Sequence, residues 1–124
     1  MTSLSTPLLI GGAELPGSDG TFAVPDPAHA GQVVGYAAAA SAADASAAVD
    51  AAEKAWPAWA ALSAAERTGL VLKALGALEP DADDRAEVLS RENGKIRIEA
   101  AIDLAVFTGR FHQAAEFAPA LDDD

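Results

Sequence analysis

Helical periodicity from residue 41 onward constrains the fold of this chain more than any other feature. Ser41 is followed three residues later by Asp44, and Ser63 by Glu66. In a capping box a hydroxyl at the helix start and a carboxylate three residues on satisfy each other's backbone N–H groups. Apolar residues then recur at spacings of three and four, which is the period of an amphipathic helix. The sequence therefore predicts that everything after residue 40 is mainly helical.

Prolines and an Asn-Gly pair divide this region into four predicted helices. The first runs from residue 41 to about Ala55, because Pro57 would break a continuous helix, and a short turn then carries Trp59. The second begins at Ser63, the third covers about 81–92, and the fourth about 95–118. The residues predicted to face inward are Ala45, Val49, Ala52, Trp56, Trp59, Leu70, Val71, Ala74, Leu75, Leu78, Ala82, Ala86, Leu89, Ile98, Ile102, Ala105, Val106, Phe107 and Phe111.

Short apolar runs separated by turn residues precede the helices. Residues 8–12 and 21–24 flank the turn sequence PGSDG and are predicted to pair as a β-hairpin, with 32–38 as a third strand. The predicted fold is thus mainly α with a small N-terminal β-hairpin. We expect one partial domain over 1–124, with strands and a loop over 1–40, helices over 41–118 and an acidic tail over 119–124.

Composition limits the core and the possible partners. Hydrophobic residues make up 51% of the chain, but many are alanines, which bury little area, so we expect a thin core. The formal charge of −11 repels phosphate backbones and anionic membranes, which argues against nucleic-acid and membrane binding. No apolar run approaches the ~20 residues of a membrane span, and no signal-peptide pattern opens the chain, so we expect a cytoplasmic protein.

The stretch SRENGKIRIEA, residues 90–100, is the densest group of charges and could in principle hold an anion. The Asn93-Gly94 pair suits a residue with positive φ that closes one helix before Lys95 begins the next. Charge runs are usually solvated. We therefore interpret the stretch as a helix end and a helix start on the surface.

Other polar pairs have the spacing of functional sites but lack the rest of the pattern. His112 and Glu116 stand four apart, as two metal ligands do, without a further histidine nearby in sequence. Glu99 and Asp103 could be paired carboxylates, but acid–base work needs burial that separates their pKa values. A third group resembles the start of a calcium loop and consists of Asp81, Asp83, Asp84 and Glu92. Arg85 and Ala86, however, occupy the positions where such a loop needs an oxygen ligand and a glycine. No metal site is predicted.

The order of several sequence pieces resembles the start of aldehyde dehydrogenases. These pieces are LLIGG (8–12), GSDGTFAVPDPA (17–28), VVG (33–35), SAADASAAVDAAEKAWPAWAALSAAER (41–67) and LSRENGK (89–95). The resemblance covers about residues 8–118. It implies the N-terminal part of the α/β coenzyme-binding domain, incomplete in this chain. It also implies oxidation of an aldehyde to a carboxylic acid with NAD or NADP as the hydride acceptor.

The residues that the resemblance assigns to catalysis lie downstream of the matched region. In the family a cysteine thiolate attacks the carbonyl, a glutamate acts as base and an asparagine steadies the oxyanion. This chain has no cysteine. We therefore expect a truncated family member that is inactive by itself, with no catalytic, cofactor-binding or metal-binding residues and no bound coenzyme. By resemblance alone, Phe107 falls near a wall of the substrate tunnel.

Several positions depart from the family pattern. The family usually has asparagine where Asp26 stands, proline where Ile96 stands and an apolar residue where Arg85 stands, and it runs unbroken helix through Pro80. The alternative function is a non-catalytic helical module that binds another protein subunit. Its contact surface would be Val49, Trp56, Trp59, Phe107 and Phe111. In either case we expect self-association or a protein partner through exposed apolar helix faces.

Overall fold

The computed structural model describes residues 4–121, so the last three residues of the predicted acidic tail, 122–124, lie outside the described part of the chain. Two compact units make up the chain. The first comprises Met1–Pro57 with Arg91–Gly94, and the second comprises Ala58–Ser90 with Lys95–Asp124. The single partial domain over 1–124 stays a prediction.

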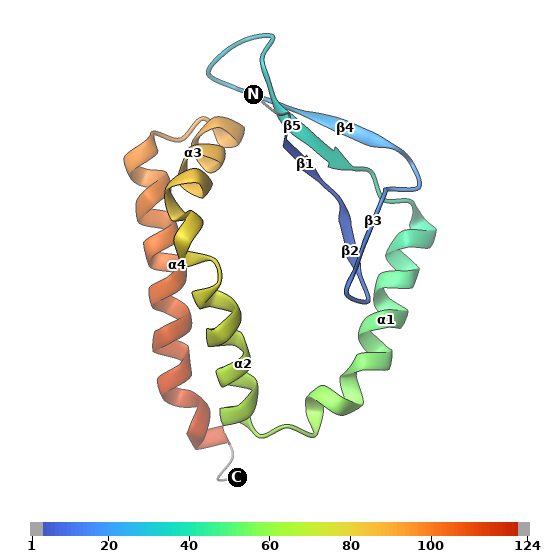
Figure 1. Cartoon of the computed structure of the whole chain (residues 1–124), viewed down its shortest axis with the longest axis vertical. Coiled ribbons are helices and arrows are strands. Elements are labelled where there is room, and N and C mark those ends of the chain that lie inside the picture. The colour runs from blue at the N-terminus through green and yellow to red at the C-terminus, as the bar shows by residue number, and fades with distance from the viewer. Residues whose placement is uncertain (1–3, 122–124) are drawn as a thin grey trace. The chain divides into compact units, whose positions relative to one another are not determined.

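A three-stranded sheet forms the centre of the first unit. Its strands are β1 (Leu4–Thr6), β4 (Thr21–Pro25) and β5 (Val33–Ala38), and β5 lies between the other two (Figure 1). β1 runs parallel to β5, with Leu4 opposite Gly35, and β4 runs antiparallel to it. The third predicted strand, 32–38, is thus confirmed as β5.

The hairpin exists, but its predicted partners are wrong. β2 (Leu8–Ile10) pairs antiparallel with β3 (Ala13–Leu15), while the segment predicted to pair with 8–12 pairs with β5 instead. Gly11 and Gly12 both have positive φ, at 60° and 84°. Two such residues make the tight turn that suits the twist of a hairpin, so the chain reverses at once instead of at PGSDG.

Gly17 is held against the backbone that leaves β5. A Cβ atom at Gly17 would lie 2.2 Å from the carbonyl oxygen of Ala39, far inside van der Waals contact. That same oxygen accepts a hydrogen bond from the Asp19 N–H at 3.0 Å. The turn therefore needs glycine because the two backbone segments lie too close for a side chain.

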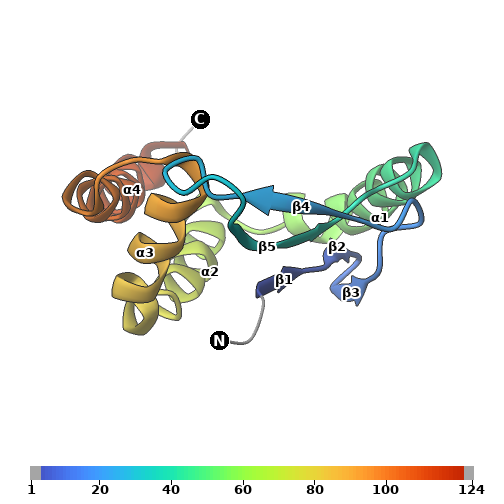
Figure 2. The ribbon, with the colours of Figure 1, turned by 90° about the horizontal axis from the view of Figure 1, so that it is seen from above.

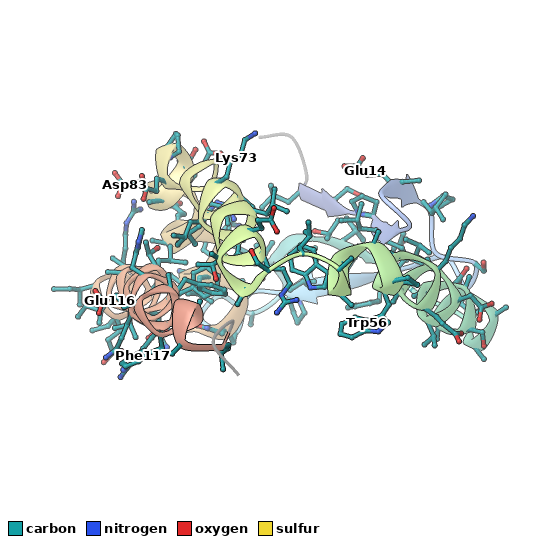
Figure 3. The ribbon with its side chains drawn as sticks, turned by 90° about the horizontal axis from the view of Figure 1, so that it is seen from below. Glu14, Trp56, Lys73, Asp83, Glu116 and Phe117 are labelled. Carbon is teal, nitrogen blue, oxygen red and sulfur yellow. The ribbon has the colours of Figure 1, made fainter. Side chains whose placement is uncertain are left out.

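The first helix is longer than predicted. α1 spans Ala42–Ala60 and includes Pro57, so the prediction that the helix ends near Ala55 is wrong. Pro57 lies in the last turn, where it removes one backbone hydrogen bond and little helix follows. The prediction that the tryptophans face the core is also wrong, because α1 has no buried residue. Trp56 projects from the helix (Figure 3) with 62% of its surface exposed, and Trp59 is likewise exposed.

The second unit is built from helices close to those predicted. They are α2 (Ala64–Gly76), the short 3₁₀ turn η1 (Glu79–Asp81), α3 (Ala82–Asn93), α4 (Arg97–Phe117) and the 3₁₀ turn η2 (Ala118–Leu121). α2 and α3 follow one another alongside α4 (Figure 2). The α2 capping box is confirmed in both directions, since the Glu66 N–H donates to Ser63 Oγ and the Ser63 N–H donates to the Glu66 carboxylate.

The core is as thin as the composition predicts. Among the side chains that the structure describes, the buried apolar ones are four alanines, one valine and one leucine: Ala64, Ala86, Ala100, Ala118, Val34 and Leu75. Alanines let helix backbones approach closely but remove little apolar area from water. Most of the large apolar side chains, which could bury more, stay exposed.

The predicted inward face of α4 is wrong. Ile98, Ile102 and Val106 are 66%, 54% and 51% exposed, whereas Ala100 is completely buried and Leu104 is half-buried. The error has a physical cause, because α4 carries apolar residues on almost every side. A helix of this kind gives no unique inward direction from periodicity alone.

Candidate functional site

Charged side chains of the stretch 90–100 form ion pairs with other residues of this chain. Lys95 Nζ pairs with the Asp103 carboxylate, and Arg97 pairs with Glu87. Gly94 has φ 77°, which confirms the predicted positive-φ residue after α3. These cations already contact carboxylates, so the arrangement supports the interpretation as helix punctuation.

Asp26, in the first unit, is a buried charged residue. It follows β4 and is only 5% exposed. Its Oδ1 accepts the backbone N–H groups of Ala28 at 2.9 Å and His29 at 3.2 Å. Its Oδ2 lies 3.2 Å from His29 Nδ1 and 3.8 Å from Arg91 Nε. The carboxylate thus closes the loop before β5 and joins it to the end of α3.

The electrostatics of Asp26 favour its charged form. Burial raises the pKa of this carboxyl, but hydrogen bonds from the His29 ring and from the Ala28 amide outweigh it, so the pKa lies below its ordinary value. Sequence reasoning noted Asp26 only as a departure from a family asparagine. The DPAH sequence is the available signal, because an aspartate before proline often bonds to the backbone two residues on.

A second carboxylate, Asp44, fastens the start of α1. The Ser41 N–H donates to it at 2.8 Å, which confirms the predicted capping box. Ser18 also donates to Asp44, from its N–H at 3.1 Å and from Oγ at 2.8 Å. The hydrogen bonds from Ser41 and Ser18 together lower the pKa of Asp44 to about 2. The contact with Ser18 joins the turn before β4 to the helix, and no sequence pattern marked it.

A cavity lies beside the predicted tunnel residue. Phe107 and Phe111 meet edge to face, with ring centroids 4.8 Å apart. Phe107 lines an open, mostly apolar cavity of about 330 Å³ together with Leu75, Leu78, Ala101 and other residues of the second unit. Cavities of this size hold small organic ligands in other proteins. The assignment of Phe107 to a substrate tunnel stays a prediction.

The remaining polar candidates do not assemble into a site. Within residues 4–121 no three histidine, aspartate or glutamate side chains are grouped as they would be around a metal ion. Glu99 and Asp103 are both exposed, and Asp103 is paired with Lys95. In the same described range, no helix combines the length and the apolar character needed to cross a membrane.

Comparison with known proteins identifies the fold. Residues 15–124 match the model of the aldehyde dehydrogenase family. An NAD-dependent aldehyde dehydrogenase from Sinorhizobium meliloti is 32% identical, with a TM-score of 0.89 over 95% of this chain and 24% of that one. A salicylaldehyde dehydrogenase from Pseudomonas putida G7 is 30% identical, with a TM-score of 0.86 over 94% of this chain and 24% of that one. No curated protein sequence matches the chain.

A third solved structure gives the same picture. Lactaldehyde dehydrogenase from Escherichia coli is 28% identical, with a TM-score of 0.87 over 95% of this chain and 25% of that one. The chain thus spans about a quarter of the length of these solved relatives. The family match, which covers most of the chain, and the shared fold confirm the resemblance, and the chain belongs to the aldehyde dehydrogenase family, as an N-terminal portion of its fold.

Proposed function

We propose that this chain serves the NAD-dependent oxidation of an aldehyde as the N-terminal part of a coenzyme-binding domain, and that it does not catalyse the reaction by itself. The observation that carries the proposal is the family match over residues 15–124, set beside a coverage of only 24% of a solved relative. The chain also has no cysteine to form the thiolate that attacks an aldehyde.

Coenzyme binding, in this proposal, depends on residues outside the region matched here. Neither G-x-G-x-x-G nor a phosphate-binding loop occurs in the 124 residues. The formal charge of −11 also repels the pyrophosphate of a dinucleotide. The described relative from Sinorhizobium meliloti is NAD-dependent, which favours NAD over NADP for the assembled enzyme. In this proposal, residues beyond the matched region select the aldehyde substrate of the assembled enzyme.

The activity test compares the purified chain with an intact relative. The chain is incubated with NAD or NADP and a panel of aldehydes, and formation of reduced coenzyme is followed by absorbance. We expect no rate above a blank without protein, while the NAD-dependent aldehyde dehydrogenase from Sinorhizobium meliloti reduces NAD with an aldehyde substrate in the same buffer. Turnover that survives repurification of the chain would contradict the proposal.

Calorimetry tests coenzyme binding separately from turnover. Titration of the chain with NAD at millimolar concentration should give no saturable heat. A dissociation constant of about 100 μM or tighter, which corresponds to a binding free energy of roughly −5.5 kcal/mol, would show that the isolated chain holds a coenzyme site of its own.

The alternative, a non-catalytic module that binds another subunit, shares one requirement with this proposal. Both need something to cover the exposed apolar side chains. These include Ile98, and Trp56 and Phe117, which Figure 3 labels. The two proposals differ in how the chain behaves alone. A monodisperse monomer with sharp near-ultraviolet dichroism and a cooperative melt would favour the module, because it would show that the core is complete.

A further inference from the structure

The cavity of about 330 Å³ in the second unit lies between two walls of different character. One wall comes from the end of α2, from η1 and from the start of α3, and it carries all the charged lining residues. The other wall comes from α4 and is apolar apart from Thr108. Small side chains face the space from both walls, namely Ala82, Ala101 and Ala105. The cavity therefore remains open because no large side chain fills it.

The apolar part of the cavity is accessible and large enough for a small ligand. Phe107 and Leu78 line it and are 46% and 37% exposed. A ligand that covered these two side chains would remove apolar surface from water. A smaller engineered cavity, of about 150 Å³, binds benzene. The present cavity thus has room for a ring or a branched aliphatic group with a short chain.

Charged side chains line the same cavity without internal partners. Glu79 belongs to η1, Asp83 projects from the first turn of α3 (Figure 3), and Arg85 follows on the same helix. No ion pair joins any of these three side chains to another residue of the described range 4–121. A charged ligand group could therefore bind here without breaking an existing ion pair.

The balance of charge favours a cation over an anion. The two carboxylates outnumber the single guanidinium in the lining, and Asp81 and Asp84 add two more carboxylates to the same segment. The chain as a whole carries −11. A concave surface with this excess of one sign concentrates ions of the opposite sign and repels those of its own.

Two positions at which the sequence departs from the family pattern lie at this cavity. Pro80 is part of η1, the 3₁₀ turn that separates α2 from α3 where the family runs unbroken helix. Arg85 lines the cavity where the family usually has an apolar residue. The shape and charge of this wall are therefore features of this chain.

We propose that the cavity between α2, α3 and α4 binds a small organic amine. The ammonium group pairs with Glu79 and Asp83, and an aromatic or branched aliphatic body lies against Leu78 and Phe107. This inference does not rest on the proposed function, because the ligand is neither the aldehyde nor the coenzyme. An apolar carboxylate held by Arg85 is the competing occupant, since a guanidinium binds carboxylates well, and the test distinguishes the two.

Equilibrium dialysis of the full chain compares ligands that share a ring and differ in charge. Phenethylamine carries the ammonium group, phenethyl alcohol is neutral and phenylpropionate is an anion. We expect the amine to bind with a dissociation constant of about 1 mM or tighter. It should bind about threefold or more tightly than the alcohol, as a partly exposed ion pair allows.

Three outcomes of the dialysis would overturn the proposal. The first is equal binding of amine and alcohol, which would remove the role of the carboxylates. The second is tighter binding of phenylpropionate that is lost in Arg85→Leu, which would make an anion the occupant. The third concerns methylamine, which lacks the ring and should bind about tenfold or more weakly than phenethylamine. Equal binding of these two amines would show attraction to an acidic surface alone.

Two neighbouring aspartates provide a matched pair of variants. Asp83 and Asp84 both lie in the first turn of α3 and are both exposed, but only Asp83 lines the cavity. Asp83→Asn should weaken binding of phenethylamine by about threefold, whereas Asp84→Asn should leave it unchanged. Both substitutions change the net charge and the helix start alike, so effects of charge at a distance or on folding would appear in both. Equal affinities of the two variants would overturn the site.

A variant that fills the cavity tests its apolar part. Ala105→Leu adds a branched apolar group to the α4 wall and should weaken binding of phenethylamine by about tenfold, because the ligand and the new side chain need the same space. Ala52→Leu is the control, since Ala52 is an exposed alanine of α1 outside the cavity. Wild-type affinity in Ala105→Leu would place the amine elsewhere and overturn the proposal.

Discussion

Each of the two units is stabilised internally by a different kind of contact. In the first, Asp26 and Asp44 each collect hydrogen bonds from several backbone and side-chain groups and join segments distant in sequence. In the second, helices meet around alanines and Leu75, next to a cavity of about 330 Å³. Polar contacts are complete within a local segment, whereas apolar contacts need enough surface on both sides. A quarter of a fold can therefore satisfy its loops before it can fill its core.

The same substitution at two glycines should have opposite effects in the two units. Gly17→Ala should destabilise by about 1–3 kcal/mol or more, because its Cβ would meet the Ala39 carbonyl oxygen at 2.2 Å. Gly69 lies inside α2 with nothing within 4 Å of a new Cβ. Gly69→Ala should stabilise by roughly 0.5–1 kcal/mol, since alanine loses less backbone freedom in a helix.

Urea unfolding followed by far-ultraviolet dichroism measures both variants. Changes of the same sign at Gly17 and Gly69 would contradict the contrast between a tightly apposed turn and an open helix face. The unfolding curve of the wild-type chain in the same urea series serves as the reference.

Two leucines of α2 sharpen the comparison within the second unit. Leu75 is buried and borders the cavity, whereas Leu70 is half exposed. We expect Leu75→Ala to cost about 2 kcal/mol, near the low end for such a change, because the open space beside it already leaves contacts unmade. Leu70→Ala should cost less than about 1 kcal/mol. A cost above about 4 kcal/mol at Leu75 would show a core better packed than the structure has it.

Acid should act on the first unit through Asp44. Its pKa is lowered from 3.8 to about 2, so the stabilisation from its charged form is complete above pH 3.8 and is lost as the pH falls towards 2. Amide hydrogen exchange should show that protection at the start of α1 declines across this range. Asp44→Asn should lower protection already at neutral pH and flatten the decline. An Asp44→Asn profile that still parallels the wild type would assign the acid effect to other groups.

Sequence reasoning located the helices well and their orientation poorly. Capping boxes at Ser41 and Ser63 and the Asn93-Gly94 pair are local chemistry, so the helix starts and the end of α3 followed from them. The orientation of α4 depends on which other surface covers it, and an apolar helix carries no local signal for that choice. The prediction of strand pairing failed for a similar reason. Both 8–12 and 32–38 were available as partners for β4, and the structure pairs β4 with β5.

The candidate sites divide along the same line. The charged stretch 90–100 could be assigned from turn chemistry, but Asp26 with Arg91 and Asp44 with Ser18 join residues far apart in sequence. Spacing arguments reach only a few residues along one helix. A contact between a loop and a helix end becomes visible only when the chain is folded.

The absence of any buried residue in α1 also bears on the order of folding events. A capped, alanine-rich helix depends on neighbours four residues away, and such helices form on a timescale of about 0.1–1 μs. The parallel pairing of β1 with β5 instead joins Leu4 to Gly35 across the intervening loop. Contacts of long sequence separation form slowly, because loop closure must precede them. We therefore expect α1 to be present early, and the closing of β1 onto β5 to limit the rate at which the first unit is completed.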